Sequence, residues 1–135
     1  MLKVVLDTNV LISATIVRGN QFRILELGRL KEIQIISSPQ ILEEFREVLN
    51  RPRFGLSQES IEEAINELKN IAQIVHPQEK VDVVKEDPDD NAIIECAIAG
   101  KADYIITGDN DLLELKEYKW IKIRNSQSFI QETNL

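Results

Sequence analysis

The stretch LKVVLDTN, residues 2–9, decides how the rest of this sequence is interpreted. An apolar run, broken only by Lys3, passes directly into Asp7, Thr8 and Asn9. A short Val-rich run that ends in turn-forming residues is typical of a buried strand in a parallel sheet. We therefore expect a strand over residues 2–6, with a carboxylate at its carboxyl end.

Apolar strand-like runs alternate with helical patterns along the whole chain. This alternation predicts an α/β fold of three layers around a central parallel sheet of five strands, in one domain of residues 1–135. A helix capped by Asp89 or Asp90 is expected to end at Gly100, after a polar loop over residues 78–88. The further strands are expected at 33–36, 74–75, 102–107 and 120–123, and the further helices at 22–30, from 39 to before Pro52, at 57–72 and from Ser126 or Ser128.

Composition narrows the function classes. The net charge of −7 weakens, but does not exclude, a role in binding phosphates. An aromatic content of 5% argues against an extended base-stacking platform. A single cysteine, no signal-like start and no apolar run of membrane-spanning length predict a cytoplasmic protein.

Acidic side chains stand at the ends of strand-like runs or at helix starts in four places. In open parallel sheets, ligands bind beyond the carboxyl ends of the strands. Two carboxylates about 5 Å apart repel by roughly 3 kcal/mol at an effective dielectric near 20, so a gathered set needs protons or a cation. Oxygen ligands select Mg²⁺ or Mn²⁺. The four places are Asp7, Glu44, the pair Asp89–Asp90, and Asp109 with Asp111.

Each acid also has a purely structural explanation. Asp7 suits a turn after a strand, and Glu44 could belong to a solvated helix face, although it borders the apolar stripe. Helix capping explains one acid of the Asp89–Asp90 pair, and a turn before a helix explains Asp111 better than Asp109. Thr8 and Asn9 beside Asp7 are suited to hydrogen bonding with the carboxylate and with a metal-bound water.

Three motifs extend the interpretation. They are VLDTNVLISA at 5–14, SSPQILEEFREVLNRPRF at 37–54 and EDPDDNAIIECAIAGKADYIITGDNDLLEL at 86–115. In this order and spacing, they resemble the PIN-domain family over nearly the whole chain. The sequence looks most like the group described as toxins of toxin–antitoxin systems, relatives of VapC-type toxins. The resemblance implies a PIN-like α/β/α fold with strand order 3-2-1-4-5.

The resemblance also implies roles for the acids. Counting back from the DNAIIECA motif selects Asp90 over Asp89 as the third acid. Asn9 and Thr107 are implied as supporting polar groups. The implied metal ligands are Asp7, Asp90, Asp109 and Asp111. The implied catalytic acids are Asp7, Glu44, Asp90 and Asp109.

The function that the resemblance implies is hydrolysis of single-stranded RNA by an Mg²⁺- or Mn²⁺-dependent endoribonuclease. The expected partners are the RNA substrate, an antitoxin protein and a second copy of the chain in a homodimer. A catalytically silent metal- or RNA-binding relative and a related DNA nuclease are the alternatives. Arg18, Arg51 and Arg53 flank the expected cleft in sequence, but solvated surface charge is the preferred interpretation of each.

Overall fold

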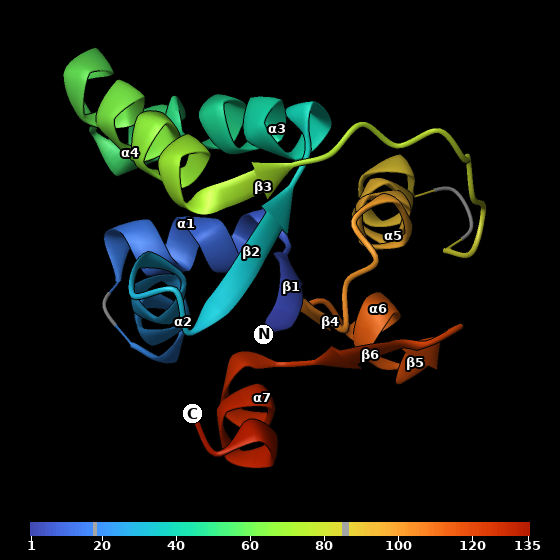
Figure 1. The fold of residues 1–135 in the computed structure, drawn as a ribbon. Helices are drawn as coiled ribbons and strands as arrows, with labels where there is room; N and C mark the ends of the chain where they lie inside the picture. The colour runs from blue at the N-terminus through green and yellow to red at the C-terminus, as the bar shows by residue number, and fades with distance from the viewer. Residues whose placement is uncertain (18, 85–86) are drawn as a thin grey trace.

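The centre of the fold is a twisted sheet with the strand order β3-β2-β1-β4-β6-β5 (Figure 1). A computed structural model describes residues 1–17, 19–84 and 87–135. All neighbouring strands pair in parallel except β5, which runs antiparallel to β6. The strands are β1 Leu2–Leu6, β2 Ile33–Ser37, β3 Ala72–Ile74, β4 Tyr104–Ile106, β5 Glu117–Tyr118 and β6 Ile121–Arg124.

This topology confirms the expected α/β fold and the order of its five parallel strands. The additional strand β5 was not expected. Its hairpin turn places Lys119 at a φ of 54°, a left-handed conformation that favours Gly or Asn. Because a lysine occupies this position, the sequence carries no recognisable hairpin signal there.

Helices flank the sheet on both faces (Figure 1). Helix α1 was not expected, because its sequence is apolar nearly throughout and lacks a polar face. None of the helices in the described part of the chain is both long and apolar enough to cross a membrane. The helices are α1 Thr8–Ile16, α2 Asn20–Arg29, α3 Pro39–Leu49, the 3₁₀ turn Pro52–Phe54, α4 Gln58–Ile71, α5 Pro88–Ala99, α6 Asn110–Leu113 and α7 Ser126–Thr133.

Two glycines show which helix covers which face. A Cβ atom on Gly28 of α2 would lie 2.4 Å from the Ile35 side chain, and one on Gly100, after α5, would lie 2.5 Å from that of Ile36. Adjacent residues of a strand point to opposite faces, so α2 and α5 cover opposite faces of the sheet. Helix α7 lies on the α2 face, where the rings of Phe129 and Tyr104 have centroids 4.9 Å apart.

The end of α5 differs from the expectation in one detail. Gly100 has an ordinary right-handed φ of −88°, and the left-handed position belongs to Lys101, with a φ of 52°. The backbone N–H groups of Lys101 and Ala102 donate to the carbonyls of Ile98 and Ala97, which is the Schellman pattern. Gly100 is therefore needed for close approach to the sheet, not for its backbone conformation.

Candidate metal centre

Asp7 lies at the junction of β1 and α1. It is the N-cap of α1, where its Oδ1 accepts a hydrogen bond of 2.9 Å from the Val10 backbone N–H. Its Oδ2 accepts a hydrogen bond from the Thr107 hydroxyl. Its own backbone N–H donates to the Ile106 carbonyl at 3.1 Å, which ties the carboxyl ends of β1 and β4 together. A single buried carboxylate thus fixes the centre of the sheet edge.

Thr107 connects Asp7 to Asp109. The Thr107 side chain is 1% exposed, and its oxygen also accepts a hydrogen bond of 3.0 Å from the Asp109 backbone N–H. Asp109 is the N-cap of α6, and its Oδ1 accepts a hydrogen bond of 2.7 Å from the backbone N–H of Asp111. The two acids that follow β1 and β4 are therefore held in one hydrogen-bonded unit.

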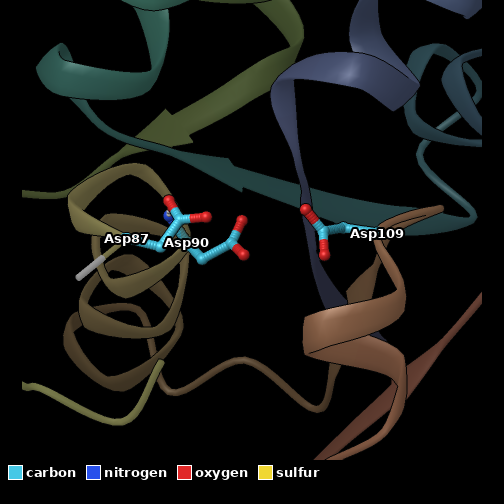
Figure 2. Close-up of side chains that lie close together, drawn as sticks. All are labelled: Asp87, Asp90 and Asp109. Atoms are coloured by element: carbon cyan, nitrogen blue, oxygen red, sulfur yellow. Dashed lines mark hydrogen bonds between the residues drawn. The ribbon is translucent and has the colours of Figure 1, made fainter. Parts of the chain in front are cut away.

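Helix α5 brings further carboxylates to the same place. Oxygen atoms of Asp87, Asp90 and Asp109 all lie within 4.8 Å of one another. Figure 2 shows the Asp90 and Asp109 carboxylates pointing toward each other, with Asp87 beside Asp90 at the start of α5. The N-cap of α5 is Asp87, whose Oδ1 accepts from the Asp90 backbone N–H at 3.1 Å, so the expected cap at Asp89 or Asp90 was wrong.

Two buried polar side chains of α5 anchor the segment that precedes this helix. Asn91 Oδ1 accepts hydrogen bonds from the backbone N–H groups of Val83 and Val84 at 2.9 and 3.0 Å, and its Nδ2 donates to the Val84 carbonyl at 2.8 Å. Glu95 accepts from the Val81 N–H at 3.0 Å. These bonds fix the approach to Asp87 and therefore the position of the acids at the start of α5.

Glu44 approaches from α3. Its Oε2 accepts a hydrogen bond of 2.8 Å from the Thr8 hydroxyl at the start of α1. Burial raises the pKa of Glu44, the Thr8 hydrogen bond opposes this, and the charges of Asp89 and Asp7 raise the pKa further. Glu44 therefore lies within electrostatic reach of the acids that follow β1 and begin α5, although it is not part of the Asp87, Asp90 and Asp109 group.

The remaining acids and amide lie farther outside. Asp89, Asp111 and Asn9 are exposed. Asp111 contacts Asp109 through its backbone N–H, and Asn9 makes no side-chain hydrogen bond within the part of the chain that the structure describes. The structure thus brings together Asp90 and Asp109 from the expected ligand set, adds Asp87, and leaves Asp111 at the rim.

Asp90 is a buried carboxylate that lacks a compensating partner among the described residues when no metal is bound. Its side chain is 8% exposed, and its Oδ2 has no hydrogen-bond partner in the described structure. Burial, followed by the charge of Asp109, raises the pKa of Asp90 to about 7. Burial also raises the pKa of Asp7, against the lowering effect of the Thr107 hydrogen bond. An all-oxygen group with an unsatisfied buried oxygen fits a hard divalent cation.

Comparison with known families gives this arrangement its context. A family model described as PIN domain matches residues 3–111, which include all of the acids described above. The chain belongs to the PIN-domain family. PIN domains are, in general, metal-dependent nucleases, and the acidic group of this PIN domain agrees with a metal-dependent chemistry.

A relative of this PIN domain comes from an archaeon. The uncharacterized protein MJ1680 of Methanocaldococcus jannaschii is 39% identical to it over 129 residues. The alignment covers 92% of this chain and 82% of the relative. The similarity thus extends over most of both chains, and the name of the relative assigns no substrate.

Several residues of the PIN-domain centre were missed or left open by the sequence. Asp87 was passed over because three acids in four residues make any one of them a plausible cap. Asn91 and Glu95 stand four residues apart on one helix face, a spacing that could have indicated a shared role. Arg51 lines a cavity of about 220 Å³ with Glu44 and Asp89.

One of the other two arginines contacts an aromatic ring. The Arg53 guanidinium lies 4.7 Å from the centroid of the Phe54 ring. Arg18 lies outside the described residues.

Proposed function

We propose that this PIN domain is an endoribonuclease that hydrolyses phosphodiester bonds of single-stranded RNA and depends on Mg²⁺ or Mn²⁺. The observation that carries the proposal is the group of Asp87, Asp90 and Asp109, in which the buried Oδ2 of Asp90 has no hydrogen-bond partner among the described residues. Family membership supports the nuclease chemistry, and the oxygen-only ligands support a hard ion.

The roles of the residues follow from their contacts. We assign metal binding to Asp90 and Asp109, with Asp7 as a further ligand and Asp87 as an added candidate. Their geometry supports Asp90 over its exposed neighbour Asp89 as the third acid.

Other groups complete the proposed centre. Glu44 would orient the attacking water from the α3 side, Thr107 would hold Asp7 and Asp109 in position, and Asn9 and Asp111 would act at the rim. A divalent ion held there would supply Lewis-acid activation of the phosphodiester.

Paired substitutions test the proposal sharply. Cleavage of single-stranded RNA should require Mg²⁺ or Mn²⁺ and stop with EDTA. Asp90→Asn should abolish cleavage, and Asp89→Asn should retain most of it. Glu44→Gln and its exposed neighbour Glu43→Gln form a second matched pair, with circular dichroism as the control for folding.

Three outcomes would count against the proposal. Full cleavage by Asp90→Asn would refute the assigned centre. Metal binding by calorimetry without cleavage of any RNA would favour a catalytically silent relative, and cleavage confined to DNA would favour a DNA nuclease.

The proposed biological setting is narrower still. A toxin role, an antitoxin partner, a homodimer and a cytoplasmic location are supported by the motif resemblance and the composition. Light scattering at micromolar concentration tests the homodimer. Growth arrest on expression, relieved by the product of the adjacent gene, tests the toxin role, and growth unaffected by an active enzyme would contradict it.

A further inference from the structure

A positively charged hairpin stands apart from the acidic centre. Residues 116–124, KEYKWIKIR, carry four cationic side chains and one acid in a chain whose net charge is −7. They comprise Lys116, β5, the hairpin turn and β6, and β5 is the outer edge of the sheet (Figure 1). The hairpin therefore has the opposite charge to the rest of the molecule.

An exposed aromatic ring is fixed at the tip of this hairpin. Trp120, the only tryptophan of the chain, is 51% exposed. Its indole Nε1 donates a hydrogen bond of 2.9 Å to the Ala102 carbonyl. The adjacent Lys101 is exposed. Because the ring is already held by this bond, a ligand that stacks on it loses little further conformational freedom.

Two lysines of the hairpin lie near tyrosine rings and have little or no ion pairing in the described part of the chain. The Lys122 Nζ lies 5.8 Å from the centroid of the Tyr104 ring, and the Lys119 Nζ lies 5.7 Å from that of Tyr118. Lys119 reaches Glu79 only at 4.0 Å, the limit for an ion pair. Within the described residues, Lys101 and Lys122 form no ion pair. These charges are available to a ligand.

The hairpin tip lies at the opposite end of the strands from the acids. Lys122 pairs with Tyr104, the first residue of β4, whereas Asp109 follows the last residue of β4. The distance from Ala102 to Thr107 along the chain is five residues, about 16 Å of extended strand. A longer RNA can span this distance, and a dinucleotide held at the acids cannot.

We infer that the β5–β6 hairpin is a second contact surface for single-stranded RNA, on which a base stacks against Trp120 and phosphates contact Lys101, Lys119 and Lys122. The inference rests on the proposed function for its choice of RNA. Lysines along a strand neutralise phosphates, and a single aromatic face accepts any base without sequence preference. The hairpin would retain long substrates while the acids act on them.

The composition of the hairpin favours RNA over a protein partner. Protein interfaces are built around an apolar centre with few lysines. Trp120 is the one exposed large apolar side chain among the described hairpin residues, and the exposed Lys119 and Lys122 are close to it in the sequence. An isolated ring among cations matches a nucleic-acid surface.

The fluorescence of Trp120 provides a direct test without turnover. Titration of the protein in EDTA with a single-stranded RNA oligonucleotide should quench this fluorescence saturably. The Lys119→Gln/Lys122→Gln variant should bind about tenfold more weakly, and the slope of log affinity against log salt should fall by about 1.4, the value for two lost phosphate contacts on a single strand. The control Lys31→Gln/Lys69→Gln has the same charge and should bind like the wild type.

Substitutions of the ring complete the design. Trp120→Ala should weaken binding, measured by anisotropy of labelled RNA, about tenfold, and Trp120→Phe, which keeps an aromatic face, should restore most of it. Cleavage of a dinucleotide should be unchanged in all of these variants.

Failure of the hairpin surface is distinguishable from failure of the proposed function. Absence of fluorescence quenching in a protein that cleaves RNA, or equal binding by the two lysine variants, would overturn the hairpin surface. Hairpin-dependent binding in a protein that never cleaves RNA would support the surface and refute the proposed nuclease.

Discussion

At the residue scale, one hydroxyl group positions two of the proposed ligands. Thr107 donates to the Asp7 carboxylate and accepts from the Asp109 backbone N–H. Thr107→Val preserves the volume but removes both bonds. We expect a 10- to 100-fold loss of metal affinity, the usual effect of removing a group that orients a ligand.

Calorimetric titration with Mn²⁺ measures this loss. Thr107→Ser keeps the hydroxyl and should retain most of the affinity. Unchanged affinity in the valine variant would show that Thr107 plays no part in metal binding.

Asp90 should give the metal-free protein a characteristic pH dependence. Its pKa is raised from 3.8 to about 7, so the folded protein retains a proton that the unfolded chain releases between these values. The free energy of unfolding should therefore fall as the pH rises from about 4 to about 7. In Asp90→Asn this decline should be reduced, and at pH 8 the variant should be more stable than the wild type by about 1–3 kcal/mol, the cost of an unsatisfied buried polar group.

Urea unfolding in EDTA at pH 4 and pH 8 tests this prediction. The two proteins should have nearly equal stability at pH 4. Asp89→Asn, at the exposed neighbouring position, should follow the wild-type curve. Parallel curves for wild type and Asp90→Asn would contradict the assigned burial of this carboxylate.

At the scale of elements, two adjacent residues at the end of α5 share the work that one glycine often does. Gly100 allows close approach to the sheet, and Lys101 adopts the left-handed backbone conformation. Lys101→Gly should stabilise the protein by about 0.5–1 kcal/mol, because Gly adopts the left-handed conformation without strain. Gly100→Ala should destabilise it by about 1–3 kcal/mol, because the new methyl group would overlap Ile36.

Chemical denaturation of both variants provides the measurement. Lys69→Gly, in the last turn of α4 and with ordinary helical geometry, is the control and should destabilise the protein. A stabilising Gly100→Ala substitution would mean that α5 can move away from the sheet at little cost.

The elements also show what sequence reasoning could and could not find. Apolar runs bounded by turn residues located β1, β2 and β4, because burial on both faces leaves a continuous signal. The edge strand β3 spans Ala72–Ile74 and not the expected 74–75, and its residues are only partly buried or exposed. Helix α1 was missed because a buried helix has no polar face. Strand β5 was missed because a lysine, and not Gly or Asn, occupies the left-handed position of its turn.

The positions of some acids could be predicted from the sequence, and those of others could not. Asp7 and Asp109 could be placed from the strands that they follow. The start of α5 could not, because the position of this helix depends on the long-range bonds of Asn91 and Glu95 to the loop before it.

At the scale of the whole molecule, metal binding should stabilise the entire domain. An ion that binds only the folded state at 100 times its Kd adds about 2.7 kcal/mol to the free energy of unfolding. Mn²⁺ should therefore raise the thermal midpoint by several degrees in a single transition over residues 1–135, and EDTA should reverse the shift.

Differential scanning calorimetry checks both parts of this expectation. Asp109→Asn should remove most of the shift, whereas Glu43→Gln should keep it. Two separate transitions would contradict the single domain, and a shift retained in Asp109→Asn would place the ion elsewhere.

The capping roles of Asp7 and Asp109 affect which of the acids would be retained in evolution. Asp7 and Asp109 each stabilise a helix start, so selection for folding alone would preserve them in a lineage that had abandoned catalysis. The Oδ2 atom of Asp90 has no comparable structural contact, and in the metal-free state its burial carries a cost. Among descendants, replacement of this aspartate by an uncharged residue should therefore be the earliest mark of a lost enzyme.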